Sequence, residues 1–340
     1  MPKIKPEVSE IDGVFRIKID IPFDVKFVCS YLFNLDDKNI LIDAGLNFID
    51  WKRKFLNILS GLNIRIEEID YCFVTHEHLD HSGLLKFLKR KNPDLKIVMH
   101  NYANECLKIA VQQDNFPIIE KNAEKIAKAF IQYGMEPDYV KRIIQTFINW
   151  PKIVRYREPD IICNKDCEIK INSNEIKVIW TPGHSIGHIC VFNPRKSHLF
   201  SGDHILSRIT PHIGIYNQLS LMNPNRFYPN ILKTYLESLD KIKNLNPKII
   251  FPAHQEVIFD PLKRIEAIKK HHQNRFRQIK DTIKDKPRTP YEISQIHFGK
   301  DLDDMNKYLA MNEVLAHLIY LENKNDVKRI EKNGKILFSS

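Results

Sequence analysis

The segment that most constrains this chain is the motif His76-x-His78-x-Asp80-His81, which follows the apolar run Ile69–Thr75. The β-branched and aromatic residues of that run predict a strand, so the motif begins at a strand end. Its three imidazoles and one carboxylate are ligands that zinc prefers, usually in sets of four or five. A segment of six residues is too short to supply two such sets of ligands, so further ligands are expected from elsewhere in the chain.

Three other segments place a histidine or an aspartate directly after an apolar strand pattern. They are Val178–His184, His198–Asp203 and Ile249–His254. Functional side chains of proteins are concentrated in the loops that follow such scaffold elements. A lone histidine is more often a core or surface residue. Four strand ends of this kind in one chain instead favour a common site.

Together these four segments resemble the metallo-β-lactamase superfamily over roughly residues 10–260. That superfamily has an α/β fold, an αββα sandwich in which two mixed sheets pack face to face with helices outside. The resemblance implies two bound metal ions, zinc by default, with iron or manganese as an alternative in one position. The implied ligands are His76, His78 and His184 for the first metal, Asp80, His81 and His254 for the second, and Asp203 as the bridge between them.

The resemblance also implies a mechanism with two metals about 3.5–4 Å apart. A water between the metals would lose a proton and attack the substrate, while one metal polarises the carbonyl or phosphoryl oxygen. Asp80 is the predicted catalytic residue, because it could take that proton or orient the attacking oxygen. Asp43, within Ile40–Gly45, is expected to fix a ligand imidazole through a hydrogen bond.

For several other residues near these motifs, two interpretations stay open. His188 is either a partner of the ligands or the start of a strand. His204 is expected to be a neighbour of the site. His212 and Tyr216 follow Asp203 and would either line the substrate pocket or pack as ordinary loop residues.

Details of the motif indicate which members of the superfamily this chain is more similar to. His78 stands where the flavo-diiron oxygen reductases have a glutamate. His81 and His184 differ from the arginine or cysteine of the enzymes that destroy penicillin. The chain is therefore more similar to the glyoxalase II, lactonase and RNase Z-like members.

The chain is expected to contain a catalytic domain over 1–260 and a small module over 261–340. Apolar residues at three- and four-residue spacing predict helices at Ala103–Val111, Ala123–Tyr133 and Pro137–Phe147. These helices form an insertion at about 101–150, which is predicted to be a lid over the cleft or a homodimer contact.

The C-terminal module begins with a long basic helix pattern over Leu262–Lys284. Two more helices follow, and then a hairpin is predicted around Asn333-Gly334, because Asn-Gly between apolar strands is a strong hairpin signal. Helices that end in a hairpin are typical of a winged-helix-like module. The segments His271-His272-x-x-Arg275, Thr289–Ile293 and Glu313–Leu318 resemble the C-terminal extension of a subgroup that includes a mitochondrial lactamase-like endoribonuclease. His271 and His272 are expected on the surface, since adjacent helix residues point in different directions.

The charge of the chain is concentrated in this module. The net charge is +10, and residues 261–340 hold 17 Lys and Arg against 11 Asp and Glu. Such an excess either binds an anionic partner such as nucleic acid through phosphate contacts, or only keeps the protein soluble. The tail therefore leaves a nucleic-acid partner open.

Location and redox state are predicted from what the sequence lacks. It contains no run of about 18 apolar residues and no apolar N-terminal signal, so a cytoplasmic protein without a membrane partner is expected. Cys163 and Cys167 form the only close cysteine pair and lack the spacing of a zinc knuckle. All six cysteines are expected to be reduced.

The leading prediction for function is a metal-dependent hydrolase of a small thioester or ester. One alternative is a phosphodiesterase that acts on RNA. A second is a nucleic-acid-binding protein with a non-catalytic metal site, although a complete ligand set argues against it.

Overall fold

The computed structural model describes residues 7–21, 25–112, 116–149, 153–215 and 230–340, and it divides the chain into two compact units. Unit 1 contains Met1–Lys108, Val154–Pro211 and Ser238–Ile265, and unit 2 contains Ile109–Ile153, His212–Glu237 and Glu266–Ser340. Most of the predicted helical insertion therefore belongs to the same unit as the C-terminal residues.

The first sheet of unit 1 has seven strands within the described residues, ordered β1-β2-β3-β4-β5-β6-β7. The neighbours from β1 to β4 pair antiparallel, and those from β4 to β7 pair parallel. The bounds are β1 Glu7–Ile11, β2 Val14–Asp20, β3 Phe27–Leu35, β4 Lys38–Ile42, β5 Ile69–Phe73, β6 Lys96–His100 and β7 Ile161–Cys163.

The second sheet of the described unit 1 has the order β12-β11-β10-β9-β8. Its strands pair antiparallel except β11 and β12, which run parallel. The bounds are β8 Cys167–Ile171, β9 Asn174–Trp180, β10 Ile189–Asn193, β11 His198–Gly202 and β12 Ile249–Pro252. Both sheets are thus mixed, as the resemblance implied.

Aromatic rings from both sheets form the core between them. The Phe33 ring of the first sheet stacks on Phe200 of the second at 5.0 Å between centroids, and Tyr31 meets the edge of Phe251 at 5.4 Å. Phe200 is fully buried. Tyr31 and Phe33 are two residues apart in β3, so their side chains point to the same face, toward the second sheet.

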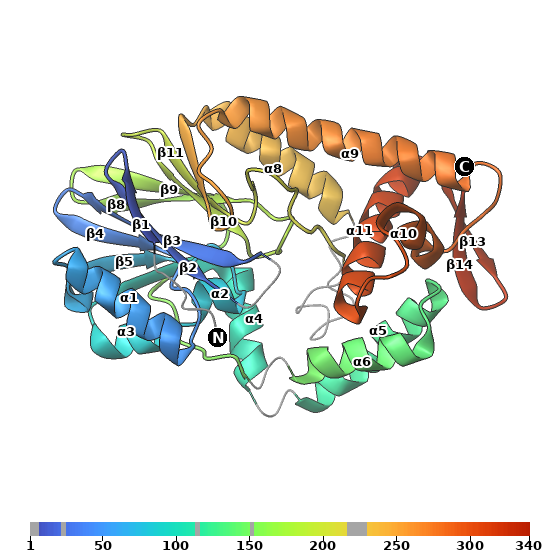
Figure 1. Ribbon diagram of the computed structural model, residues 1–340, viewed down its shortest axis with the longest axis horizontal. Helices are drawn as coiled ribbons and strands as arrows, with labels where there is room; N and C mark the ends of the chain where they lie inside the picture. The colour runs from blue at the N-terminus through green and yellow to red at the C-terminus, as the bar shows by residue number, and fades with distance from the viewer. Residues whose placement is uncertain (1–6, 22–24, 113–115, 150–152, 216–229) are drawn as a thin grey trace. The chain divides into compact units, whose positions relative to one another are not determined.

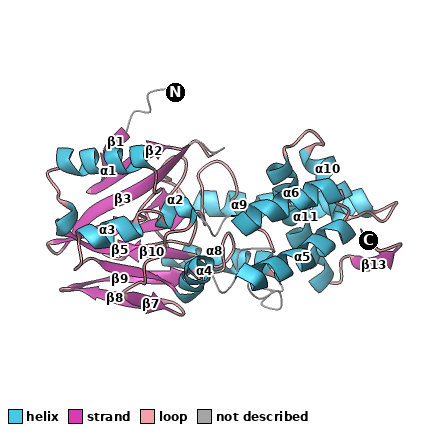
Figure 2. Cartoon of the chain, turned by 90° about the horizontal axis from the view of Figure 1, so that it is seen from below, coloured by secondary structure: helices cyan, strands magenta, loops and turns pink. Residues whose placement is uncertain are grey.

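Helices cover the outer face of the first sheet. They are α1 (Ile49–Gly61) and α3 (Leu85–Lys91), and both Figure 1 and Figure 2 show them outside that sheet. A short 3₁₀ turn, η1 (Ile66–Glu68), leads into β5. On the other side, residues 238–245 of α8 (Ile231–Leu245) contact loops of the second sheet, where Ser238 donates to the Pro182 carbonyl oxygen. Unit 1 is therefore an αββα sandwich, the predicted fold class.

Phe200→Ala is expected to lower the free energy of unfolding of unit 1 by about 3–5 kcal/mol, because it leaves a cavity between the sheets. Chemical denaturation followed by circular dichroism measures the loss. The matched control is Ile162→Ala, which truncates an apolar strand residue that is 41% exposed. That control is expected to cost less than about 1 kcal/mol. Equal losses in the two variants would contradict the interdigitated core.

Unit 2 is mostly helical, as Figure 2 shows for α5, α6, α10 and α11. The three predicted helices of the insertion are present as α4 (Asn101–Val111), α5 (Phe116–Gln132) and α6 (Pro137–Asn149), with α5 starting seven residues earlier than expected. Most of α4 lies in unit 1. Tyr216 lies outside the described residues, so its place near the site stays a prediction.

The C-terminal elements follow their local sequence signals. The long basic helix is α9 (Pro261–Ile283), and α10 (Pro290–Phe298) starts where Thr289 and Glu292 cap each other's backbone N–H groups. After α11 (Asp304–Asn323), strands β13 (Lys328–Lys332) and β14 (Lys335–Ser339) form the predicted hairpin. Asn333 and Gly334 have φ of 50° and 71°, as the two-residue turn requires. The winged-helix likeness stays a prediction.

Two expectations about side chains were wrong. Cys163 and Cys167 form a disulfide, which joins the end of β7 in one sheet to the start of β8 in the other. His272 is buried rather than exposed, and its Nδ1 lies 3.0 Å from His317 Nε2. The contact between His272 and His317 depends on two helices that meet only after packing, so helix periodicity does not predict it. Cys163 and Cys167 are four residues apart, and the expectation for them was wrong because it rested on a reducing location and not on their spacing.

The buried pair His272 and His317 predicts a pH dependence of stability. Burial lowers the pKa of His272 to about 2 and that of His317 to about 3. The folded state therefore keeps both rings neutral, while the unfolded chain protonates them near pH 6.5. Stability is fully present above that pH, and each ring should cost up to about 1.4 kcal/mol per pH unit as the pH falls below it.

Denaturation of His317→Phe between pH 7 and pH 4 tests this dependence. The variant should lose less stability with falling pH than the wild-type protein. His297→Phe is the comparison, since this imidazole is only partly buried; burial lowers its pKa as well, so it should change the slope less than His317→Phe does. An unchanged slope in His317→Phe would contradict the neutral pair.

Candidate metal centre

The seven sequence-predicted ligands come together at one edge of unit 1, in the segments that follow four of its strands. The first motif follows β5 and runs into the short helix α2 (Leu79–Ser82), and the other ligands follow β9, β11 and β12. The backbone amide of Ala253 donates to the Gly202 carbonyl oxygen, which holds the β11 and β12 loops together. Adjacent parallel strands thus bring Asp203 and His254 to the same point.

One group of the cluster contains only imidazoles. His78 Nδ1 lies 2.8 Å from His76 Nε2 and 3.1 Å from His184 Nε2. One ligand atom from each of these three residues lies within 4.8 Å of the others. His76 is fully buried, so its ring is held in place before any ion binds.

A second group combines one carboxylate with two imidazoles. Asp80 Oδ2 lies 3.7 Å from His81 Nε2 and 3.4 Å from His254 Nε2. His254 Nδ1 contacts the Phe27 carbonyl oxygen at 2.6 Å. Since a carbonyl can only accept, Nδ1 carries the proton and Nε2 is left as the ligand atom.

Asp203 lies between the two groups. Its Oδ2 is 3.4 Å from His184 Nε2, while its Oδ1 is 3.4 Å from His254 Nε2 and 3.6 Å from His81 Nε2. The two carboxylate oxygens therefore face different groups. Within the described residues, Asp203 Oδ1 and His81 Nε2 are buried and make no hydrogen bond. Buried polar atoms that lack hydrogen bonds are rare in proteins, and here they fit metal ligation.

The charges of the cluster follow from these close contacts. Burial alone would raise the pKa of Asp80, but His81 and His254 hold it down at about 2. Burial would likewise lower the pKa of His81, but the Asp80 and Asp43 carboxylates raise it to about 9. A proton on His81 thus balances the carboxylates when no metal is bound. A metal needs the neutral ring, so binding would release that proton.

Asp43 orients His81, as the sequence predicted. Asp43 Oδ2 lies 2.8 Å from His81 Nδ1 and accepts a hydrogen bond from Thr75 Oγ1 at 2.9 Å. Asp43 Oδ1 accepts from the backbone N–H of Thr75 at 2.7 Å. The Asp43 side chain is 2% exposed. The His81 carbonyl oxygen accepts from Ala44 N at 2.7 Å, so the ligand is held through both backbone and side chain.

His188 is a partner of the cluster and not only the start of β10. Burial lowers the pKa of its imidazole, which is therefore neutral. His188 Nε2 accepts from the backbone N–H of Asp203 at 3.1 Å, and Nδ1 contacts Thr181 Oγ1 at 2.9 Å. His204 lies beside His188, with 5.7 Å between ring centroids. His212 belongs to unit 2.

Glu77 is a buried residue of the site that the sequence reasoning missed. It stands between His76 and His78, and its Oε2 accepts from Ser185 Oγ at 2.6 Å. Burial raises the pKa of this carboxyl. The contact ties the loop of His76 and His78 to the loop of His184. The sequence signal that could have found Glu77 is its place in an extended segment, where the side chain between His76 and His78 points away from both of them.

The described part of the chain has no helix that is long and apolar enough to cross a membrane.

The sequence profile of the Metallo-beta-lactamase superfamily matches residues 24–254, which is more than half of the chain. The chain belongs to the metallo-β-lactamase superfamily. A second profile, Metallo-beta-lactamase-like, C-terminal domain, matches residues 276–340.

This superfamily member is similar to proteins from bacteria and fungi. "Probable metallo-hydrolase YqjP" of Bacillus subtilis is 24% identical, with 97% of this chain and 98% of that protein aligned. "Atrochrysone carboxyl ACP thioesterase" of Aspergillus fumigatus is 21% identical over 74% of this chain and 58% of that protein. The crystal structure of a beta-lactamase domain protein from Burkholderia ambifaria covers 99% of this chain and 96% of its own, with 21% identity and a TM-score of 0.81. This superfamily member is a metallo-hydrolase.

Proposed function

We propose that this chain is a dinuclear metal-dependent hydrolase that cleaves a small thioester or ester. The observation that carries the proposal is Asp203, whose two oxygens face two separate groups of candidate ligands. In this proposal the ligands are His76, His78 and His184 for one ion, Asp80, His81 and His254 for the other, and Asp203 for both. Zinc suits this set of nitrogen and oxygen ligands, and iron or manganese is the alternative for one position.

When bound, the two ions would supply an activated water and polarise the carbonyl group of the substrate. The protein's own residues would position the reacting groups. Asp80 is held ionised by His81 and His254, so its carboxylate would orient the attacking oxygen or receive its proton. Asp43 and His188 would keep the ring of His81 and the backbone of Asp203 in place.

The thioester class is supported by a relative whose name states that chemistry, the Atrochrysone carboxyl ACP thioesterase. RNA is the second candidate substrate, and a basic pocket within unit 2 favours it. That pocket has a volume of about 660 Å³, and its charged lining residues are four lysines, Lys300, Lys307, Lys332 and Lys335, against two glutamates, Glu136 and Glu292. Lysines around a cavity attract phosphate groups. A cytoplasmic location is the remaining expectation of this proposal.

Turnover of a glutathione thioester and of end-labelled single-stranded RNA, measured side by side with added zinc, tests the function. Wild-type protein should cleave the thioester, and Asp80→Asn should lose at least about 100-fold in kcat/KM. Asp285→Asn is the matched control because Asp285 is exposed. RNA cleavage that Asp80→Asn abolishes, without thioester cleavage, would replace the first proposal by the second. Activity that all three proteins share would point to a contaminant.

A further inference from the structure

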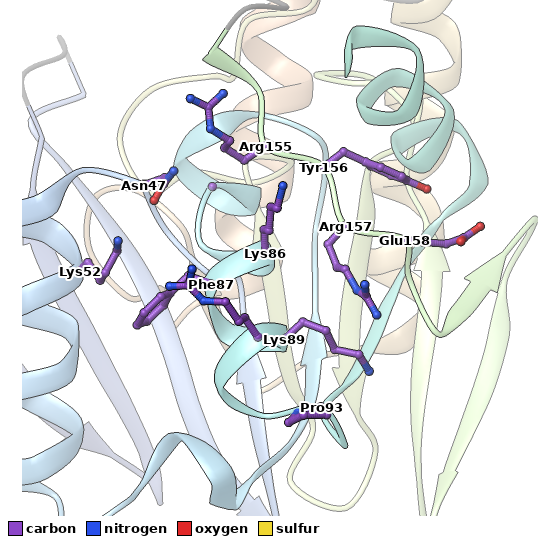
Figure 3. A pocket seen from close by; sticks show the side chains of 12 residues that line it. Asn47, Lys52, Lys86, Phe87, Lys89, Pro93, Arg155, Tyr156, Arg157 and Glu158 are labelled. Atoms are coloured by element: carbon purple, nitrogen blue, oxygen red, sulfur yellow. The ribbon is translucent and has the colours of Figure 1, made fainter. Parts of the chain in front are cut away.

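A second cavity of unit 1 lies between α1, α3 and the extended segment 155–158. Its volume is about 820 Å³, which is within the range of pockets that hold small molecules. The lining residues are Asn47, Lys52, Gly83, Lys86, Phe87, Lys89, Arg90, Pro93, Arg155, Tyr156, Arg157 and Glu158, and Figure 3 shows their arrangement. None of the candidate metal ligands lines this cavity, which we call the α1–α3 groove.

The lining of the α1–α3 groove is strongly cationic. Six of its described residues carry a positive charge, and Glu158 alone among them carries a negative one. Lys89 is buried and already bonded to Asp160 at 2.8 Å, so it supports the wall. Lys86 and Arg157 are exposed and make no ion pair within the described residues. Several like charges around one hollow repel each other, and an anionic ligand would relieve that repulsion.

Aromatic rings give the α1–α3 groove a shaped apolar surface. The Lys52 ammonium lies 4.8 Å from the centroid of Phe87, and the Arg90 guanidinium carbon lies 5.9 Å from it. Tyr156 is held by a hydrogen bond from its hydroxyl to Asn104 Oδ1 at 2.9 Å. Cations beside a flat ring suit a ligand that carries phosphates on an organic body, because arginine and lysine bind phosphate and the ring packs the rest.

One end of the α1–α3 groove is built from backbone next to the metal cluster. Gly83 follows His81 by two residues, and a Cβ there would lie 2.5 Å from Leu79 O and 2.7 Å from Asn47 N. Leu84 N also donates to Gly45 O at 3.2 Å. Glycine is therefore required for this close approach, which joins the groove floor to the segment that holds His81.

We propose that the α1–α3 groove binds a phosphate-bearing small molecule of about nucleotide size. The proposal goes beyond hydrolysis and does not depend on it, because phosphate binding needs none of the metal ligands. The ligand class follows from the cationic lining, the aromatic surface and the volume together. A nucleic-acid strand is the competing occupant, and the test separates the two.

Calorimetric titration of the full, metal-free chain with adenosine 3′,5′-bisphosphate tests this proposal. The wild-type protein should bind, and affinity should fall as salt is raised. The double variant Lys86→Glu/Arg157→Glu should weaken binding at least about tenfold, because it removes two cations that would bind phosphate and adds two carboxylates that repel it. The control is Lys91→Glu/Lys170→Glu, which makes the same charge change at exposed positions of unit 1 outside the groove.

Three outcomes would overturn the proposal. The first is no binding of the bisphosphate to wild-type protein. The second is equal weakening in both double variants, which would show attraction by overall charge only. The third is that a 12-nucleotide single-stranded RNA binds more tightly than the bisphosphate and loses that affinity in Lys86→Glu/Arg157→Glu, which would assign the groove to a nucleic-acid strand. Thermal unfolding of each variant checks folding, and Lys86→Ala carries the same test if the double variant unfolds early.

Discussion

Asp203→Ala is expected to remove metal from both positions and to lower kcat/KM by more than about 100-fold. Losing an outer partner of a metal ligand already costs about 10–100-fold, so losing a ligand shared by two ions should cost more. The Asp203 carboxylate lies within 3.6 Å of imidazole nitrogens from both groups of the cluster. Without it, the imidazoles of His81 and His254 would also lose their nearest shared negative charge. Metal content by plasma mass spectrometry and thioester turnover measure the two losses.

The control for this prediction is Asp285→Ala, which removes an exposed carboxylate. It should retain the metal content and turnover of the wild-type protein. If Asp203→Ala also kept two metals and full turnover, Asp203 would not be the bridge. Loss of only one metal would instead place Asp203 on a single ion.

Asp43→Ala is expected to lower the free energy of unfolding by about 3–5 kcal/mol and metal affinity by about 10–100-fold. Asp43 accepts three hydrogen bonds in a buried setting, two from Thr75 and one from the His81 ring. Its removal leaves those donors without partners and lets the ring of His81 turn. Denaturation curves and competition with a zinc chelator measure the two effects separately.

Asp43→Asn separates the structural effect from the effect on the metal. The amide keeps one oxygen that can accept from the backbone N–H of Thr75, so most of the stability should return. Its other atom is an NH₂ group, which cannot accept the proton of His81 Nδ1, so metal affinity should stay low. A variant with wild-type metal affinity would show that Asp43 only supports the fold.

The ligand cluster was accessible to sequence reasoning because its signals are local. Apolar strand patterns ending in His76, His184, Asp203 and His254 depend only on residue order. Parallel neighbours in a sheet end at the same edge, so residues that follow β11 and β12 must meet. The resemblance then grouped the residues into two triads, and the structure brings each triad together.

Unit 2 shows where local sequence signals no longer suffice to predict the structure. Helix α9 and the β13–β14 hairpin were predictable from helix periodicity and from Asn333-Gly334. The burial of His272 was not, because it depends on α11 presenting His317 to it across 45 residues of sequence.

The sequence by itself determined the strand ends and the side chains able to ligate metal, because ligand chemistry and strand periodicity are local properties. Its resemblance to the superfamily implied the fold class. Only the tertiary structure decided how Asp203 divides its oxygens between the groups, how Glu77 reaches Ser185, and that cations from α1, α3 and the 155–158 segment line one groove. The contact between Glu77 and Ser185 spans 108 residues of sequence. Such contacts are set by the packing of one sheet on the other, since close packing leaves the segments of the core a single arrangement.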